Sequence, residues 1–380
     1  MIPYGKQDVT KEDIKSVVNI LNSDFLTQGP AVPLFEKSLC DYTGAEYSIA
    51  VNSATSALHI ACLSLDLKKG DILWTSAISF VASANCAIYC GAEVDFVDVD
   101  SDSGLMSVDA LRSKLLKAKS ANTLPKIVIP VHLAGQSCNM KEIFKLSKEF
   151  NFRIIEDAAH AIGAEYFDKK VGSCVFSDIS IFSFHPVKII TTAEGGAALT
   201  NNKELADRMG LFRSHGITRD KKLMNKSHNE NWYYEQISLG FNYRMSDIHA
   251  ALGRSQMQRI NSFIKKRSEI AKWYDLQFEN TPIKNLSQIE GSKSSYHLYI
   301  VRILKGKIER DKLYNLLNSS GIKANLHYIP IYRHPFFNRK TRLFGAEKYY
   351  KSAISLPIYP NISNQSLSTI VNKILENTAK

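Results

Sequence analysis

The run Lys126-Ile127-Val128-Ile129-Pro130-Val131 places apolar side chains on consecutive positions. A strand with this composition is expected to be covered on both faces. Similar short runs recur along the first two-thirds of the chain, at 48–51, 71–75, 94–97, 153–156, 178–184 and 196–200. Helical patterns separate them, at 56–67, 80–89, 108–118, 140–150 and 203–212. This alternation predicts an α/β fold with a mostly parallel sheet and helices on both sides.

The pattern changes near residue 246. A long helical pattern covers 247–278, and it is followed by a strand-like run at 296–303 and helical patterns at 310–319 and 365–380. We therefore expect a large domain over residues 1–250 and a smaller C-terminal α+β domain over residues 251–380. The polar run from Lys221 to Asn231 predicts an exposed, mobile loop within the large domain.

Composition narrows the classes of function. The chain has 380 residues, of which 44% are hydrophobic, so it can bury a sizeable core. Its formal net charge of +11 comes from scattered basic residues, without an arginine-rich arm or an aromatic RNA-binding motif. An anionic small-molecule substrate and a merely soluble basic surface both fit this distribution, and we expect no nucleic-acid partner. The six cysteines show no CxxC pair and no zinc-like spacing, so we expect no metal site and a reducing, cytoplasmic setting.

One uncharged stretch, residues 72–92, is long enough to suggest a membrane span. It contains several serine and threonine residues, however, and it is interrupted by Gly91. A buried strand followed by a buried helix explains the stretch better. The start of the chain also lacks the apolar core of a signal peptide. We therefore expect a soluble protein without a membrane partner.

Polar clusters follow three of the predicted strands. These clusters are Asn52-Ser53-Ala54-Thr55-Ser56-Ala57, Asp157-Ala158-Ala159-His160 and His185-Pro186-Val187-Lys188. Ligands of parallel α/β sheets bind beyond the carboxyl ends of the strands. The three clusters are therefore expected to meet at one edge of the sheet.

Each cluster has a functional and a structural interpretation. The first lies at a helix start, where free N–H groups can bind a phosphate, but for this cluster alone we favour an ordinary N-cap at Ser53 or Thr55. In the second, Asp157 could hold a pyridinium nitrogen protonated, or it could cap a helix. In the third, desolvation of Lys188 would lower the pKa of its amine and free it to attack an aldehyde, whereas most loop lysines are simply solvated. The order of phosphate cradle, acid and lysine favours pyridoxal phosphate.

Ordered motifs along nearly the whole chain resemble the DegT-type nucleotide-sugar aminotransferases. The matching segments are Leu26-Thr27-Gln28-Gly29-Pro30, Asn52–Leu58, Glu156–Ala161, Ser183–Lys188, Phe212-Arg213-Ser214-His215-Gly216, Gly240-Phe241-Asn242-Tyr243-Arg244-Met245 and His327-Tyr328. The resemblance implies an α/β, aspartate-aminotransferase-like (pyridoxal phosphate type I) large domain with a smaller C-terminal α+β domain. Ala193 departs from the family pattern, because relatives commonly have glycine there.

The resemblance also implies roles for particular residues. Lys188 is the catalytic residue and holds pyridoxal 5'-phosphate as a Schiff base. Asp157 pairs with the pyridine nitrogen, and His160, where many relatives have glutamine, contacts the 3-oxygen of the ring. The phosphate is held by Ala54, Thr55 and Ser183, and Phe80 stacks on the ring.

Further contacts are implied across a subunit boundary and around the substrate. Asn242 reaches the phosphate of the neighbouring subunit's cofactor, which implies a homodimer with shared active sites. Arg213 and Arg244 either bind anionic groups or form structural ion pairs. Contacts to the sugar nucleotide are expected from Tyr4, Asp24, Phe25, Leu26, Thr27, Leu326, His327, Tyr328 and Ile329.

The motif variants Ser53-Ala54-Thr55-Ser56 and Ser183-Phe184-His185 are most similar to the family branch that acts in pseudaminic acid biosynthesis. This implies transamination of a UDP-linked 4-keto-6-deoxy-N-acetylhexosamine with L-glutamate as amino donor. The alternatives are another UDP- or dTDP-ketosugar and a non-catalytic regulatory relative. Some relatives are sugar dehydratases with histidine at the lysine position, but His185 lies three residues too early and Lys188 is present.

Overall fold

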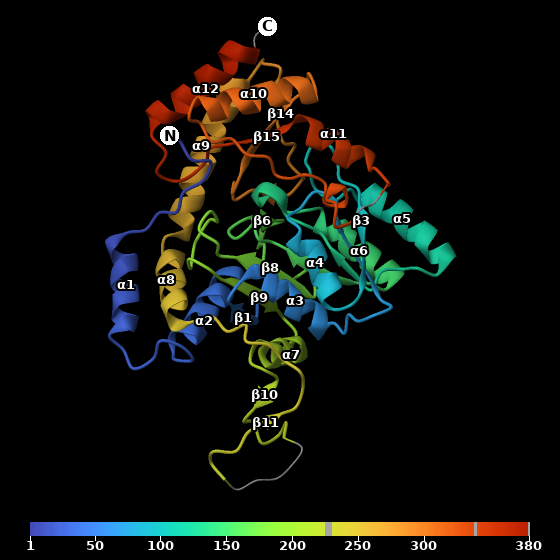
Figure 1. Ribbon diagram of the computed structural model, residues 1–380, viewed down its shortest axis with the longest axis vertical. Helices are drawn as coiled ribbons and strands as arrows, with labels where there is room; N and C mark the ends of the chain where they lie inside the picture. Colours follow the sequence, from blue (N-terminus) through green and yellow to red (C-terminus); the bar gives the residue numbers. More distant parts are fainter. Residues whose placement is uncertain (225–229, 338–339, 379–380) are drawn as a thin grey trace.

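The computed structural model describes residues 1–224, 230–337 and 340–378. Its centre is a seven-stranded sheet with the order β1-β9-β8-β5-β4-β2-β3 (Figure 1). The strands are β1 (Tyr47–Val51), β2 (Ile72–Ser76), β3 (Glu93–Val97), β4 (Ile127–Ile129), β5 (Arg153–Asp157), β8 (Ile179–Ser183) and β9 (Gly196–Thr200). Each of them coincides with a run expected from the sequence.

The sheet is mostly parallel, as predicted. In this sheet only β9 runs against the others, because it pairs antiparallel with both β8 and β1. Gly196 at the start of β9 pairs with Val51 and with Ser183, so the ends of β1 and β8 meet beside it. The ladder of β4 stops at Ile129 because Pro130 has no N–H to donate.

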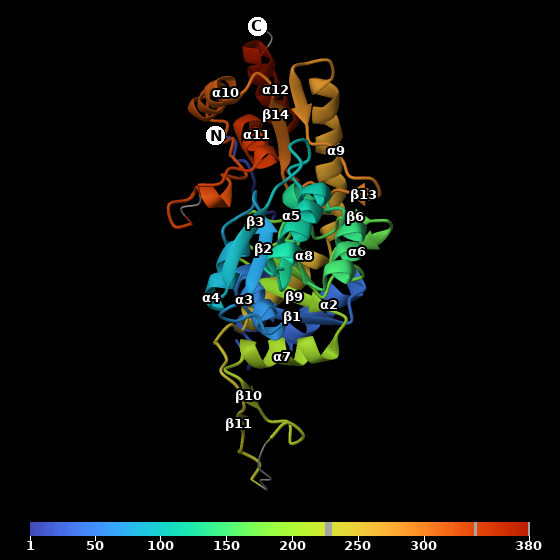
Figure 2. The same ribbon diagram turned by 90° about the vertical axis from the view of Figure 1, so that its right-hand side faces the viewer.

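Helices cover both faces of this sheet (Figures 1 and 2). They are α2 (Ala31–Thr43), α3 (Ala54–Ser64), α4 (Ala82–Tyr89), α5 (Val108–Ala121), α6 (Met140–Phe150), α7 (Lys203–Arg213) and α8 (Asp247–Met257), and α1 (Lys11–Leu21) packs on the outer side of α8. The neighbouring residues Ile181 and Phe182 of β8 belong to different cores, one with α3 and α4 and the other with α2 and α8. Burial on both faces explains why the strand sequences are apolar at consecutive positions. The helices α1 and α2 were not predicted.

The uncharged stretch 72–92 forms β2 and then α4, as expected, and most of its residues are buried. No helix in the described ranges is long and apolar enough to cross a membrane.

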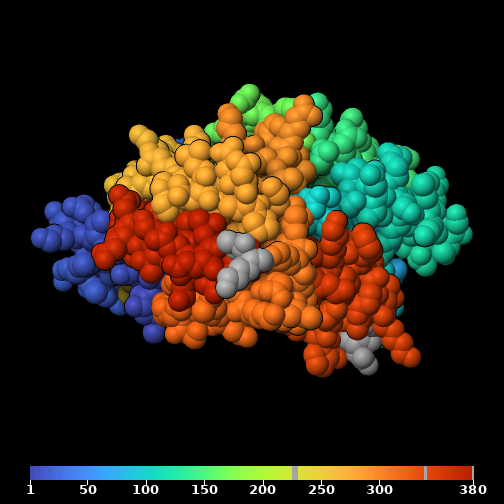
Figure 3. Space-filling view, turned by 90° about the horizontal axis from the view of Figure 1, so that it is seen from above, coloured from blue at the N-terminus to red at the C-terminus, as the bar shows by residue number. Residues whose placement is uncertain are grey.

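The C-terminal part of the chain builds a second sheet with its own core. Its antiparallel strands are β12 (Ile283–Asn285), β14 (Tyr299–Ile303) and β15 (Ala353–Leu356), with β14 in the middle. The helices around it are α9 (Ile260–Phe278), α10 (Lys307–Ser319), α11 (Phe344–Ser352) and α12 (Asn364–Thr378), and they cover the end of the molecule seen in Figure 3. The start of the chain joins this end, since Ile2 pairs with Ile322. The boundary at residues 250 and 251 stays a prediction.

The single long helix expected over 247–278 is wrong. The chain turns between α8 and α9, where the N–H groups of Gln258 and Arg259 bond to carbonyls only three residues earlier, at 3.2 and 3.0 Å. This tighter turn ends the α-helical ladder. The strand expected at 296–303 starts late because Tyr296 has a φ of 49°, which is outside the extended region.

Smaller elements complete the fold. The strands β6 (Glu165–Tyr166), β7 (Lys169–Lys170) and β13 (Ser292–Lys293) form one small sheet, and η1 (Leu133–Gly135) and η2 (Ile331–Arg333) are short 3₁₀ turns. The pair β10 (Ile217–Thr218) and β11 (Glu235–Gln236) forms an arm that extends from α7 away from the rest of the molecule (Figure 2). The predicted polar loop belongs to this arm, but residues 225–229 lie outside the described residues.

Candidate active site

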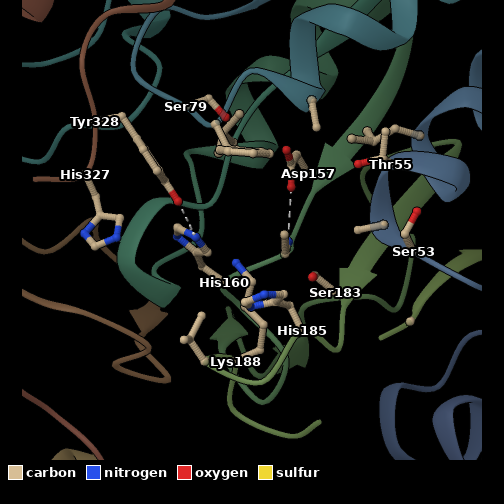
Figure 4. A pocket seen from close by; sticks show the side chains of 18 of the residues that line it. Ser53, Thr55, Ser79, Asp157, His160, Ser183, His185, Lys188, His327 and Tyr328 are labelled. Atoms are coloured by element: carbon tan, nitrogen blue, oxygen red, sulfur yellow. Dashed lines mark hydrogen bonds between the residues drawn. The ribbon is translucent and has the colours of Figure 1, made fainter. Parts of the chain in front are cut away.

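The carboxyl ends of β1, β5 and β8 border a cavity of about 370 Å³ (Figure 4). All three polar clusters contribute to its wall, as expected for the edge of a parallel sheet. The predicted site residues in this wall are Tyr4, Ala54, Thr55, Phe80, Asp157, His160, Ser183, Lys188, His327 and Tyr328. The rest of the wall consists of Ser53, Leu58, Ser79, Ala82, Val131, Ala159, His185, Val187, Glu194 and Gly195.

Lys188 lies in the loop that joins β8 to β9. Its backbone N–H donates to the carbonyl of His185 at 2.9 Å, which turns the chain back toward the cavity. Burial lowers the pKa of the Lys188 amine from 10.5 to about 8, and the charge of Asp157 acts in the opposite direction. A neutral, nucleophilic amine is therefore far more available near neutral pH than it is for an exposed lysine.

Asp157 is the last residue of β5, and its side chain is buried. Its Oδ1 accepts the N–H of Ala159 at 3.2 Å, and its Oδ2 accepts the hydroxyl of Ser83 at 2.5 Å. Because both oxygens are held, the orientation of the carboxylate is fixed. The alternative that Asp157 caps a helix is wrong, since turns follow it.

His160 is buried beside Lys188, and burial and the neighbouring positive charge hold its pKa well below the ordinary value of 6.5. The N–H of Ala134 donates to its Nδ1 at 3.3 Å. Since Nδ1 accepts, the single proton of the neutral ring resides on Nε2. Nε2 lies 3.1 Å from the hydroxyl of Tyr328, which therefore accepts that proton (Figure 4).

The start of α3 shows the N-cap expected for the first cluster, and its role in phosphate binding stays a prediction. Ser53 is the N-cap, and its Oγ accepts the N–H of Ser56 at 3.1 Å. The N–H groups of Ala54 and Thr55 stand in the first turn, where a helix has no carbonyl to offer them. A Cβ added to Gly196 would lie 2.4 Å from the nitrogen of Ala54, so only glycine lets β9 pass this close to the helix start.

Aromatic residues form the other side of the cavity. Phe80 is 59% exposed, and its ring centroid lies 6.4 Å from that of Tyr328. Tyr4 lies 5.6 Å from the ring of His327, whose pKa is lowered to about 3 by burial and by the charge of Lys188. The cavity therefore combines aromatic rings with two histidines, His160 and His327, whose pKa values are lowered.

The other predicted site residues do not line this cavity. They are Asp24, Phe25, Leu26, Thr27, Leu326, Ile329 and Asn242. The segment 24–27 is an exposed loop that pairs with Ser246 through Thr27. Asn242 is exposed on a segment that pairs with Ser214, and Leu326 packs against the core of the main sheet. Within one chain these side chains are therefore separate from Lys188.

Contacts in the structure show what Arg213 and Ala193 do. Arg213 forms an ion pair with Glu36 at 2.5 Å and donates to the carbonyl of Ala50 at 2.9 Å, so it is a structural partner of β1. Ala193 has a φ of 66°, in the region that favours glycine, and its N–H is held by the hydroxyl of Thr191 at 2.9 Å. Ala193 thus adopts a left-handed backbone conformation that glycine adopts more easily.

Ser79 and Ser83 are the site residues that sequence reasoning missed. Ser79 lines the cavity, and Ser83 holds Asp157 from behind. The available signal was a pair of hydroxyl residues four positions apart in an otherwise uncharged stretch.

Comparison with known proteins places this site in a family. Residues 7–375 match the model of the DegT/DnrJ/EryC1/StrS aminotransferase family. A UDP-4-amino-4,6-dideoxy-N-acetyl-beta-L-altrosamine transaminase of Campylobacter jejuni is 38% identical over 96% of this chain and 94% of its own length. A protein of that name from Helicobacter pylori is 36% identical over 98% and 96%.

Solved structures agree with these sequence matches. PseC of Helicobacter pylori, described as an aminotransferase of pseudoaminic acid biosynthesis, superimposes with a TM-score of 0.90 at 35% identity, covering 100% of this chain and 99% of its own. A putative sugar aminotransferase of Streptococcus pneumoniae, solved in its PLP form, gives a TM-score of 0.89 at 28% identity over 100% and 98%. The aspartate-aminotransferase-like fold class expected from the sequence is confirmed. The chain belongs to the DegT/DnrJ/EryC1/StrS aminotransferase family.

Proposed function

We propose that this protein is a pyridoxal-phosphate-dependent aminotransferase that aminates a UDP-linked 4-keto-6-deoxy-N-acetylhexosamine in pseudaminic acid biosynthesis. L-Glutamate is the proposed amino donor. The observation that carries the proposal is the buried amine of Lys188, which shares a cavity with Asp157 and with the start of α3. The names of the full-length relatives from Campylobacter jejuni and Helicobacter pylori support the substrate.

The residues present fit pyridoxal phosphate. Gly196 brings the backbone close to the start of α3, which leaves a tight concave surface with first-turn N–H groups for a phosphate. Ser183 adds a hydroxyl at the same edge of the sheet. Phe80 offers an exposed aromatic face to a planar ring. A buried, fixed carboxylate at Asp157 matches a protonated ring nitrogen.

When bound, pyridoxal phosphate supplies an aldehyde that joins to amines and a ring that withdraws electrons. Lys188 would hold it, and its amine, once released, would carry a proton from the α-carbon of the amino donor as general base and return one as general acid. A pKa of about 8 keeps that amine close to the point where both steps proceed near neutral pH.

The remaining groups would position the reactants. Asp157 would keep the ring nitrogen protonated, because its fixed carboxylate interacts favourably with a nearby cation. With the cofactor bound, the Nε2–H of His160 would exchange its bond to the Tyr328 hydroxyl for one to the 3-oxygen of the ring. Tyr4, His327 and Tyr328 would contact the sugar, and the basic balance of the chain suits a nucleoside diphosphate.

We also propose a homodimer in which Asn242 completes the neighbouring site. Asn242 is exposed and does not line its own chain's cavity, which supports a role toward another subunit. Large apolar side chains are exposed on the arm that leads to it, with Trp232 at 73% and Leu239 at 76%. Such side chains are typical of protein interfaces.

Product analysis tests the function. The protein is incubated with pyridoxal phosphate, L-glutamate and either a UDP-linked or a dTDP-linked 4-keto-6-deoxy sugar, and the amino sugar is identified by mass spectrometry. We expect a yellow protein, amination of the UDP-linked N-acetyl sugar and a borohydride-trapped adduct on Lys188. Preference for a dTDP sugar would support the alternative ketosugar, and no turnover with either would support a regulatory relative. Full turnover by Lys188→Ala would overturn the mechanism.

A further inference from the structure

The carboxylate of Asp157 is held by a short chain of hydroxyl groups. The Oγ of Ser83 lies 2.5 Å from Asp157 Oδ2, and the Oγ of Ser79 lies 2.7 Å from that of Ser83. Ser83 is completely buried on α4, and Ser79, which is 3% exposed, lines the cavity. Figure 4 shows Ser79 and Asp157 facing the same space. The chain thus links the cavity wall to the buried side of the carboxylate.

The hydrogen bonds in this chain run in one direction. Ser83 has a single hydroxyl proton and three acceptors in reach, which are Asp157 Oδ2 at 2.5 Å, Ser79 Oγ at 2.7 Å and the carbonyl of Phe80 at 3.3 Å. The charged acceptor at the shorter distance takes the proton. Ser83 Oγ must then accept the proton of Ser79, which leaves only lone pairs of Ser79 for the cavity. Donors aligned in this way polarise one another and strengthen the last bond.

We propose that Ser83 is a positioning residue that holds Asp157 in the orientation required by the pyridine nitrogen, and that Ser79 supports it by donating to Ser83. This inference rests on the proposed function. Without Ser83, Oδ2 would be a buried oxygen without its donor, and only the N–H of Ala159 at 3.2 Å would hold the other oxygen. Such a carboxylate has lost the hydrogen bond that fixes its orientation and is free to rotate. A ring nitrogen would then meet a weaker partner.

A pair of variants of equal shape isolates the hydroxyl. Ser83→Thr keeps the hydroxyl, whereas Ser83→Val has nearly the same volume without it. We expect Ser83→Val to raise the dissociation constant of pyridoxal phosphate about 10- to 100-fold relative to Ser83→Thr, since a hydrogen bond to a charged group is lost. Dissociation constants are measured by absorbance titration of cofactor-free protein. Ser79→Ala is expected to change the dissociation constant in the same direction by a smaller factor.

A second readout separates positioning from general damage. The absorbance of the bound cofactor is recorded against pH for both variants, because protonation of the ring depends on Asp157. We expect its midpoint to move in Ser83→Val and to stay at the wild-type value in Ser83→Thr. If the branched side chains do not fold on α4, Ser83→Ala, which adds no bulk, is compared with the wild type and is expected to behave as Ser83→Val.

Equal affinities and equal midpoints for the two variants would overturn the role of Ser83. That result is distinct from a failure of the proposed function. In the latter case the wild type itself would not take up pyridoxal phosphate, or borohydride would fix the cofactor to a residue other than Lys188.

Discussion

The buried amine of Lys188 should make the cofactor-free protein less stable than a variant without it. Because the pKa is lowered from 10.5 to about 8, folding destabilises the charged form of this amine by about 3 kcal/mol relative to the neutral form. The side chain borders an open cavity, so we take this figure as an upper limit. Methionine has a similar length and no charge to desolvate. We therefore expect Lys188→Met to raise the free energy of unfolding at pH 7 by up to about 3 kcal/mol.

The stability gained by Lys188→Met should decrease as the pH rises. Below pH 8 the amine is protonated in both the folded and the unfolded chain, so the whole penalty is present. Between pH 8 and 10.5 only the unfolded chain keeps the proton, and the stability of the wild type rises with pH. The advantage of Lys188→Met should therefore fall to about 1.4 kcal/mol at pH 9.5.

Urea unfolding of the cofactor-free proteins at pH 7 and pH 9.5 measures the difference. Lys15→Met, at an exposed position of α1, is the matched control and is expected to change stability little at either pH. The reasoning is refuted if Lys188→Met is less stable than the wild type at pH 7, or if its advantage is the same at both pH values. An active Lys188→Met enzyme would contradict the mechanism separately.

Three further predictions concern the cofactor and the dimer. Asp157→Asn should reduce kcat by about 10²–10³-fold while the protein stays folded, and unchanged kcat in steady-state assays would exclude its role. Gly196→Ala should abolish tight cofactor binding in absorbance titrations, because its Cβ would lie 2.4 Å from a backbone nitrogen at the start of α3. The control is Gly210→Ala on α7, whose Cβ would have no neighbouring atom within 4 Å and which should bind the cofactor normally. If Asn242 acts across the interface, a dimer of one Lys188→Ala chain and one Asn242→Ala chain has one intact site. About half of the dimers in an equal mixture are of this kind, so mixing should restore about a quarter of the wild-type activity. Activity no higher than that of the Asn242→Ala chains alone would place Asn242 in its own site.

The sequence by itself determined the main sheet and the centre of the site. Strands covered on both faces must be apolar at consecutive positions, so the runs around Ile127-Val128-Ile129 identify them without further information. Parallel strands end at one edge, and this rule alone predicts that Asp157, His160 and Lys188 meet there. Local patterns carry this information because the periodicity of burial is a local property of each strand.

Only the tertiary structure decided the protonation and the orientation of these side chains. The tautomer of His160 depends on a backbone N–H at Ala134, and the orientation of Asp157 depends on Ser83, 74 positions earlier in the chain. The reversed direction of β9 likewise involves a distant segment, because β9 pairs antiparallel with β1. Such contacts leave no periodic trace in the sequence, because a hydrogen bond between remote residues constrains only two positions.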